Sequence, residues 1–365
     1  MSDFDHAFDD DLVSLWPPDE DLDFPDPERA DVDRSNHGQL RPPDNGARPD
    51  SRRRSASEFT SERMLRGVGE VPRAGWKRAL FRGTGGRVVA GPSAGELLER
   101  ELVDRVKRPV WGCRRVAVLS RKGGVGKTTT ALMLGHTFAS YRGDRVVALD
   151  ANPDAGSLAY RVRRETSNTI TGLLAHREQI LRYADVRAFT SQAPTRLEVV
   201  AADDDPRITD ALGARDFRLA VGLLGVHYNL VCLDTGTGVL ESAARGLLGL
   251  ADQIVVVSAP SLDSARAASS TLDWLEQNDH ADLVTGAVLA LSGVRRRGLM
   301  ELDRVEQHFA ARCRAVVRVP WDPHLEAGAE STLEELRPAT RRAYLELAAA
   351  VADGFTDVDE REEWL

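Results

Sequence analysis

The feature that most constrains this chain is a glycine-rich loop with two lysines, which directly follows an apolar run. Residues 116–120 read VAVLS, and residues 121–130 read RKGGVGKTTT. Glycines let successive backbone N–H groups converge on an anion, because no Cβ intervenes. Lys127 would add an ammonium group, and the helix expected to start there would add the positive end of its dipole. The loop therefore predicts a strand, a polyphosphate-binding loop and a helix in succession.

Apolar runs alternate with helical patterns from Arg114 onward. The expected strands are Val116–Ser120, Val146–Asp150, Leu197–Ala201, Leu230–Asp234, Ile254–Ser258, Val284–Leu291 and Ala315–Val319. The expected helices include Thr128–Ala139, Arg218–Leu224, Ser264–Glu276 and Asp303–Ala311. Runs that are apolar throughout are typical of parallel strands covered on both faces, and intervening helices provide that cover. The fold class predicted is α/β, a doubly wound and mostly parallel sheet with a P-loop, over residues 111–355.

Charge separates the remaining segments from this domain. Residues 1–50 carry fifteen Asp and Glu against four Arg, whereas residues 51–88 carry ten Lys and Arg against three Glu. High charge with little periodic hydrophobicity cannot offset chain entropy. We therefore expect a disordered acidic tail over 1–50, a basic linker or N-terminal extension over 51–110, and an acidic C-terminal tail over 356–365.

Both N-terminal segments contain apolar side chains that allow more than one interpretation. The acidic segment is either an inert solvating tail or a short amphipathic docking segment built on Phe4, Phe8, Leu12, Leu15 and Trp16. The stretch Trp76–Arg82 mixes aromatic and basic residues. It could contact anionic lipid, nucleic acid or an acidic partner, or it could pack on the domain or pair with the acidic tail. A protein partner is expected to bind through residues 1–88.

Cysteine spacing and hydropathy indicate a cytoplasmic protein. Cys113, Cys232 and Cys313 are widely spaced with no CxxC pair, so neither a disulfide framework nor a zinc site is expected. Cys232 lies in an apolar run and is expected to be buried. The N-terminus has no apolar leader, and the run Leu283–Val294 is too short to cross a bilayer. No integral membrane segment is expected.

The loop also supports a specific resemblance. Arg121 occupies the first glycine position of the general pattern GxxxxGK[ST], but Lys122–Thr129 reads KGGVGKTT. This sequence resembles the deviant Walker A motif of the ParA/MinD family of P-loop ATPases. The resemblance implies that ATP and Mg²⁺ bind here and that ATP drives formation of a homodimer, in which Lys122 reaches the partner's phosphates. It assigns nucleotide binding to Gly123, Gly124, Val125, Gly126, Lys127, Thr128 and Thr129, a Mg²⁺ ligand to Thr128, and catalytic roles to Lys122 and Lys127.

Two further motifs of the family fall on later strand ends. Asp150 closes VVALD and matches the first acid of the second motif, a residue near Mg²⁺. The second acid of that motif, which helps to position the attacking water, is replaced by Asn152. An amide orients water but accepts no proton, so hydrolysis is expected to be slow unless Asp154 substitutes. Asp234, in YNLVCLDTGTG, matches the Walker B acid and is expected to hold a Mg²⁺-bound water.

Weaker candidates lie toward the C-terminus. VPWDPHL resembles the segment that meets the adenine, which makes Pro320 and Asp322 candidate base contacts; a simple strand-to-helix turn is the alternative. Arg295, Arg296 and Arg297 form a basic loop that either contacts DNA phosphates or is simply solvated.

The layout is similar to actinobacterial MinD/ParA-like proteins, some of which are encoded beside type VII secretion systems. The function expected is an ATP-dependent, dimerising ATPase that positions or recruits a partner, as in chromosome or plasmid partitioning, at the cell pole or at a secretion system. The alternative is an ATP-binding scaffold with very slow hydrolysis, docked through its N-terminal tail. Peripheral location at nucleoid, pole or membrane is compatible with either, and the surface bound could be non-specific DNA, membrane or a protein machine.

Overall fold

The computed structural model describes residues 93–152, 156–205, 207, 212–236, 246–296, 298 and 300–355. The expectations for the acidic tail over 1–50, for residues 51–92 and for the C-terminal tail over 356–365 lie outside these residues. None of the helices in the described ranges is both long enough and apolar enough to cross a membrane.

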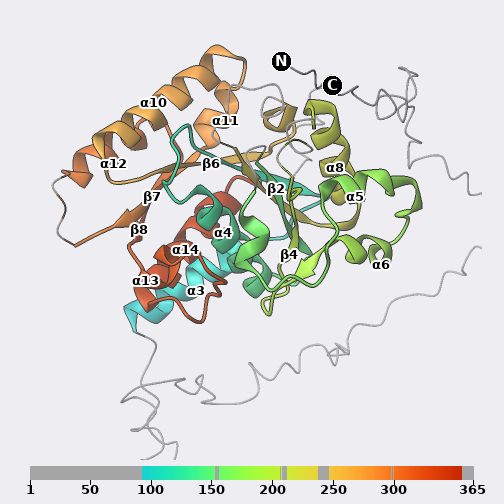
Figure 1. Ribbon diagram of the computed structural model, residues 1–365. Coiled ribbons are helices and arrows are strands. Elements are labelled where there is room, and N and C mark those ends of the chain that lie inside the picture. The colour runs from blue at the N-terminus through green and yellow to red at the C-terminus, as the bar shows by residue number, and fades with distance from the viewer. Residues whose placement is uncertain are drawn as a thin grey trace, which may run out of the picture. The chain divides into compact units, whose positions relative to one another are not determined.

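An eight-stranded sheet forms the centre of the described domain (Figure 1). Its strands are β1 Arg114–Leu119, β2 Val146–Ala151, β3 Ser191–Gln192, β4 Glu198–Val200, β5 Leu230–Thr235, β6 Gln253–Ser258, β7 Val288–Val294 and β8 Ala315–Pro320. Their spatial order is β3-β4-β2-β5-β1-β6-β7-β8. Only the edge pair β3–β4 is antiparallel, and every other neighbouring pair is parallel. The predicted α/β fold with a mostly parallel sheet is confirmed.

Helices cover both faces of this sheet. They are α3 Ala94–Val106, α4 Lys127–Tyr141, α5 Ile170–Ala175, α6 Tyr183–Val186, α8 Ala214–His227, α10 Leu262–Gln277, α11 Ala281–Gly286, α12 Leu302–Ala310, α13 Pro323–Glu326 and α14 Pro338–Ala352, with short 3₁₀ turns η3 Leu158–Arg161, η4 Arg177–Gln179 and η5 Arg187–Phe189. Val116 and Val118 of β1 join the core that contains α3, α4 and α14, whereas Ala117 and Leu119 join the core that contains α5, α8 and α10. The strand is apolar throughout because alternate residues face opposite helical layers.

One expected strand is wrong in its first half. The run Val284–Leu291 was expected to be extended, but α11 occupies its first three residues and β7 begins only at Val288. Val284 is buried within α11, in the same core as α8 and α10. A continuously apolar run carries no periodicity that separates a buried helical turn from a buried strand. The other expected strands and helices occur where they were predicted, with ends that shift by a few residues.

Helix α3 belongs to the core although it precedes residue 111. Ser93 and Glu96 form a capping box at its N-terminus, and Leu102 and Val106 are buried among residues of α4 and α14. Arg105 adds an ion pair with Asp353, which follows α14. The domain boundary expected at residue 111 therefore follows a helix that packs into the domain.

Candidate nucleotide-binding site

The glycine-rich loop joins β1 to α4 at the carboxyl edge of the sheet. Gly124 and Gly126 have φ values of +73° and +92°, in the left-handed region that favours glycine. A Cβ on Gly126 would also come within 2.7 Å of the hydroxyl of Ser292 on β7. Lys122 donates its backbone N–H to the Ser120 hydroxyl at the start of the loop. The loop is thus shaped to present backbone N–H groups at the beginning of α4, as an anion cradle requires.

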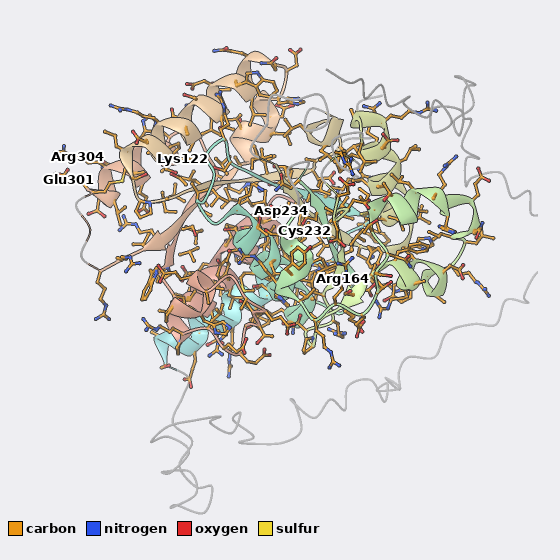
Figure 2. The ribbon with its side chains drawn as sticks, viewed as in Figure 1. Lys122, Arg164, Cys232, Asp234, Glu301 and Arg304 are labelled. Atoms are coloured by element: carbon orange, nitrogen blue, oxygen red, sulfur yellow. The ribbon has the colours of Figure 1, made fainter. Side chains whose placement is uncertain are left out.

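Lys127 and Asp234 form a buried ion pair at the base of this loop. Lys127 Nζ lies 2.8 Å from Asp234 Oδ1. The other carboxylate oxygen of Asp234, Oδ2, is buried without a hydrogen-bond partner. Figure 2 shows Asp234 in the interior of the domain, close to Cys232 of the same strand. Cys232 is fully buried, as the sequence predicted.

Asp150 stands directly beside Asp234, because β2 and β5 are paired in register at these two residues. Its carboxylate accepts backbone N–H groups from Leu158 at 2.8 Å and Asn152 at 3.3 Å. Burial, followed by the negative charge of Asp234, raises the pKa of Asp150 well above its usual range. A Cβ at Gly156 would lie 2.1 Å from Asp150 Oδ2. The backbone comes so close to this carboxylate here that a residue with a Cβ would clash with it.

These side chains fit a magnesium ion carried by a polyphosphate. Mg²⁺ commonly binds to one or two carboxylates together with substrate phosphates. Asp150 and Asp234 supply adjacent carboxylates, the unpartnered Oδ2 of Asp234 leaves one oxygen free for an ion or its water, and Thr128 stands at the start of α4. Within the described residues no group of three or more His, Cys, Asp and Glu side chains is placed so that it could hold a metal ion by itself.

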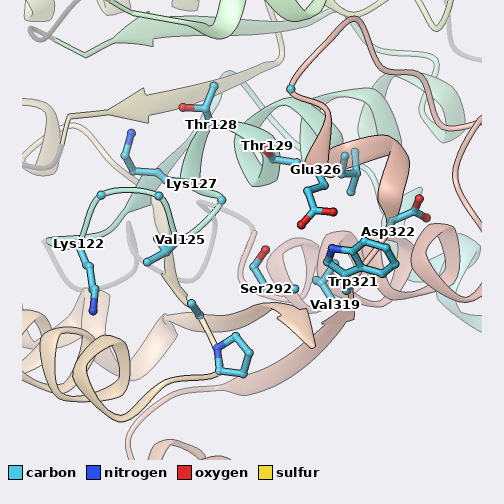
Figure 3. Close-up of a pocket in the computed structure, with 18 of the residues that line it drawn as sticks. Lys122, Val125, Lys127, Thr128, Thr129, Ser292, Val319, Trp321, Asp322 and Glu326 are labelled. Carbon is cyan, nitrogen blue, oxygen red and sulfur yellow. The ribbon is translucent and has the colours of Figure 1, made fainter. Parts of the chain in front are cut away.

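A cavity of about 700 Å³ extends from this loop toward the end of β8 (Figure 3). The predicted residues Lys122, Gly123, Gly124, Val125, Gly126, Lys127, Thr128, Thr129, Asn152, Pro320 and Asp322 all line it. Asp322 uses its buried carboxylate to accept the backbone N–H groups of His324 and Arg337. Its carboxylate thus caps α13 and fixes the turn at this end of the cavity, whereas Pro320 contributes apolar wall.

The cavity also has lining residues that the sequence did not assign to the nucleotide site, and three of them, Trp321, Arg295 and Arg161, have aromatic or cationic side chains. Trp321 lies beside the cavity between the predicted Pro320 and Asp322. The guanidinium of Arg295 stacks on its ring at 4.3 Å and pairs with Glu326 at 3.1 Å. Arg295 had been considered only as part of a basic loop; Arg297 of that loop lies outside the described residues. The third missed residue is Arg161, which follows Asp150 in η3. Trp321 lies within the segment VPWDPHL, of which only Pro320 and Asp322 were assigned to the site. No local motif marks Arg295 and Arg161, which reach the cavity from the ends of β7 and η3.

Lys122 and Lys127 point in opposite directions from the loop, as Figure 3 shows. Lys122 remains 42% exposed and lies 3.8 Å from Asp263 in the first turn of α10. A pair at this distance between exposed side chains contributes little stability. The two lysines therefore have different surroundings: Lys127 is buried and paired with Asp234, and Lys122 is partly exposed beside Asp263.

The strand, the glycine loop, the buried lysine and the paired acids at the carboxyl edge define a nucleotide-binding protein of the P-loop α/β class. Residues 116–333 match the CobQ/CobB/MinD/ParA nucleotide binding domain. The chain belongs to this family, and the resemblance to ParA and MinD is confirmed.

Several relatives are similar over long stretches. The ESX-1 secretion-associated protein EspI of Mycobacterium tuberculosis H37Rv is 37% identical over 294 residues, which are 80% of this chain and 44% of EspI. The chain thus spans less than half the length of EspI. Maintenance of carboxysome distribution protein A of Synechococcus elongatus is 29% identical over 50% of this chain and 73% of that protein.

Solved structures share the fold. A ParA family ATPase from Chlorobium tepidum superposes with a TM-score of 0.56 at 16% identity, covering 65% of this chain and 98% of that chain. A MinD from Pyrococcus horikoshii, complexed with Mg-ADP, superposes with a TM-score of 0.51 at 16% identity, covering 65% and 94%. At these identities the likeness shows the fold alone.

Proposed function

We propose that this chain is a cytoplasmic Mg-ATP-dependent ATPase that forms a homodimer on binding ATP and, in that state, recruits or positions a partner. The observation that carries the proposal is the contrast between the two lysines. Lys127 is buried against Asp234 at the base of the cradle, whereas Lys122 is exposed on the other side of the same loop. One lysine suffices to hold phosphates within a subunit, so the second is available for the phosphates of a partner subunit.

The nucleotide would enter by exchanging the partner of Lys127. A polyphosphate in the cradle offers Lys127 several anionic oxygens and frees the carboxylate of Asp234 for the magnesium side of the site. Bound Mg²⁺ would supply charge neutralisation of the phosphates. Lys127 would orient the phosphate chain, and Thr128, Asp150 and Asp234 would hold the cation. The close approach of Gly156 to Asp150 keeps that carboxylate in place.

Dimerisation is the direct test. Molar mass is measured by light scattering with saturating Mg-ATP, for wild type and for Lys122→Ala. Lys107→Ala, at an exposed position just after α3, is the matched control. Wild type and Lys107→Ala are expected to form dimers, and Lys122→Ala is expected to stay monomeric. If wild type remains monomeric with saturating Mg-ATP, the proposal is wrong.

A second candidate function is an ATP-binding scaffold with very slow turnover, and Asn152 favours it. Its side chain replaces the family's second acid, and its backbone N–H donates to Asp150. Asp154, the alternative acid, lies outside the described residues. Single-turnover hydrolysis of wild type is compared with Asn152→Asp. Rapid hydrolysis by wild type would contradict the scaffold function. Slow hydrolysis by wild type, together with faster hydrolysis by Asn152→Asp, would support it.

The partner is proposed to bind through residues 1–88. The similarity to EspI, named as secretion-associated, favours a protein machine of a secretion system as the surface, with non-specific DNA and anionic membrane as the other options. Co-sedimentation with DNA and with anionic liposomes, using full-length protein and a chain that lacks residues 1–88, separates these. If the full-length protein binds DNA or liposomes and the shortened chain does not, that material is the surface bound through residues 1–88. If the full-length protein binds neither, a protein partner is the remaining option.

A further inference from the structure

Arg161 is a half-buried cation without a carboxylate partner. It ends η3, the 3₁₀ turn that follows Asp150 and Gly156. Its Nη1 donates to the hydroxyl of Thr129 at 3.1 Å, and its Nε is buried without a hydrogen-bond partner. Among the described residues no acid lies within ion-pair distance of it, in contrast to Arg142, Arg187, Arg312 and Arg318, which are each paired. A buried guanidinium left this way is costly unless an anion arrives.

Arg161 lies in the wall of the nucleotide cavity. Thr129, to which it is bonded, belongs to the glycine-rich motif and lies two positions beyond Lys127 in α4. A Cβ at Gly328, which follows α13, would lie 3.9 Å from Arg161 Nη2. In the view of Figure 3, Thr129 stands between the Lys127–Thr128 end of the cavity and the Trp321–Asp322 end. Arg161 therefore lines the cavity next to Thr129.

Main-chain contacts fix η3 in this position. The carbonyl of Arg161 accepts the backbone N–H of Ser331, and the first residue of η3, Leu158, donates its N–H to Asp150. Burial lowers the pKa of Arg161, while the negative charge of Asp234 opposes this change. The turn is thus tied to the magnesium-side acid at one end and to the loop after α13 at the other.

We propose that Arg161 binds the phosphate of the nucleotide that lies nearest the ribose, as a second cation in the same subunit. The proposal rests on the proposed function, since it needs a nucleotide in this cavity. Lys127 serves the terminal phosphates in a P-loop, and the Pro320–Asp322 turn lies at the other end of the cavity. A guanidinium bonded to Thr129, which lies between these two ends, would meet the α-phosphate, which ATP and ADP both carry next to the ribose. The free N–H groups of Arg161 supply charge-assisted hydrogen bonds there.

The test is calorimetric titration of ATP and of ADP, each with Mg²⁺, into wild type, Arg161→Gln and Arg163→Gln. Arg163 is exposed, lies two residues further along the chain and is the matched control for charge. We expect Arg161→Gln to weaken ATP and ADP by the same factor, roughly 10- to 100-fold, which is the range for a hydrogen bond to a charged group. We expect Arg163→Gln to match wild type.

A purely structural role for Arg161 predicts a different pattern. Loss of a structural contact lowers the melting temperature of the nucleotide-free protein, whereas removal of an unpaired buried cation leaves it unchanged or raises it. If Arg161→Gln does not fold, the same titration is carried out on Arg161→Lys, which keeps the charge but has fewer hydrogen-bond donors. Its affinity for ATP and for ADP is expected to be several-fold lower than that of wild type.

Four results overturn the inference. They are no loss of affinity in the Arg161 variants, a loss for ATP alone, an equal loss in Arg163→Gln, and a lower melting temperature of nucleotide-free Arg161→Gln. These results leave the proposed function intact. Failure of wild type to bind either nucleotide overturns the proposed function itself.

Discussion

Lys127 Nζ lies 2.8 Å from Asp234 Oδ1, and these two side chains are only 8% and 1% exposed. The lysine that a nucleotide would need is therefore already neutralised by the acid that its metal ion would need. Breaking such a pair by removing one partner is more costly than the pair's net contribution, because the remaining charge stays buried. The nucleotide site and the stability of the sheet centre are coupled through these two residues.

Lys127→Ala is expected to destabilise the nucleotide-free protein by about 3 to 5 kcal/mol, because Asp234 would lose its counter-charge within the sheet. Lys122→Ala, in the same loop, is the matched control and is expected to change stability by less than about 1 kcal/mol, because its pair with Asp263 is exposed. Urea unfolding measures both. Equal effects of the two substitutions would contradict the structural difference between the lysines.

Gly156→Ala is expected to displace the carboxylate of Asp150. The added Cβ would lie 2.1 Å from Oδ2, and the bond from the Leu158 N–H would be broken, at a cost of about 1 to 3 kcal/mol. Mg²⁺-dependent nucleotide affinity should fall as well. Gly222→Ala is the control, since it is exposed within α8 with nothing within 4 Å of the added Cβ. It should stabilise the helix by up to about 1 kcal/mol. Thermal unfolding is the measurement. The melting temperature is expected to fall for Gly156→Ala and to rise for Gly222→Ala.

A feature of this protein could be predicted from the sequence where it depends on residues that are close together along the chain. The glycine loop, Lys127 and the strand-end acids Asp150 and Asp234 carry short signatures, and parallel strands bring their carboxyl ends to one edge. The sequence therefore predicted the fold, and the loop residues that it assigned line one cavity. Arg161 carries no local signature, because its position depends on how η3 meets α4 in three dimensions. Trp321 lies inside VPWDPHL, but that motif pointed only to Pro320 and Asp322. The pairing of Lys127 with Asp234 was likewise missed, since the motif describes the lysine only with its phosphates.

Stability should fall in acid through His136. This histidine is wholly buried in α4, and its Nδ1 lies 2.6 Å from the Thr195 hydroxyl. Burial lowers its pKa from 6.5 to about 4, although the negative charge of Glu334 and a backbone contact with Ser331 oppose the shift. Between these values the unfolded chain binds a proton that the folded protein does not. Its contribution is therefore complete above about pH 6.5 and is lost as the pH falls toward 4.

The shift corresponds to about 3 kcal/mol, lost between about pH 6.5 and pH 4. Unfolding free energies measured at several pH values should show a shallower acid slope for His136→Gln than for wild type. His308→Gln, which changes an exposed histidine of α12, is the control and should keep the wild-type slope. An identical slope in all three proteins would exclude His136 as the source of the acid sensitivity.

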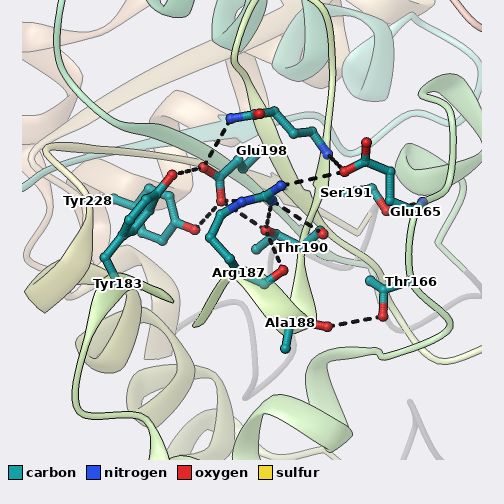
Figure 4. A network of polar contacts seen from close by, with 10 residues as sticks. Glu165, Thr166, Tyr183, Arg187, Ala188, Thr190, Ser191, Glu198 and Tyr228 are labelled. Carbon is teal, nitrogen blue, oxygen red and sulfur yellow. Dashed lines mark hydrogen bonds and ion pairs between the residues drawn. The ribbon is translucent and has the colours of Figure 1, made fainter. Parts of the chain in front are cut away.

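Glu198 of β4 lies in a buried polar network at the antiparallel edge of the sheet (Figure 4). It accepts hydrogen bonds from the hydroxyls of Tyr183, Tyr228 and Thr190, and Arg187 lies 3.4 Å away. Burial, together with Glu198, raises the pKa of Tyr183 to about 12, and the same causes raise the pKa of Tyr228. Both phenols thus remain protonated donors at neutral pH, which the buried carboxylate requires.

Tyr228→Phe is expected to destabilise this edge by about 1 to 3 kcal/mol, since it removes a donor from a carboxylate that water cannot reach. Tyr183→Phe should cost less, because Tyr183 is partly exposed and its ring still offers a face to Arg145, 3.7 Å away. Urea unfolding gives both values, and hydrogen exchange should localise the faster opening to β3 and β4. Nucleotide affinity should stay at the wild-type value, since β2 and β5 separate β4 from the loop-bearing strand β1. If Tyr228→Phe were as stable as wild type, the hydroxyl could not be a required partner of Glu198.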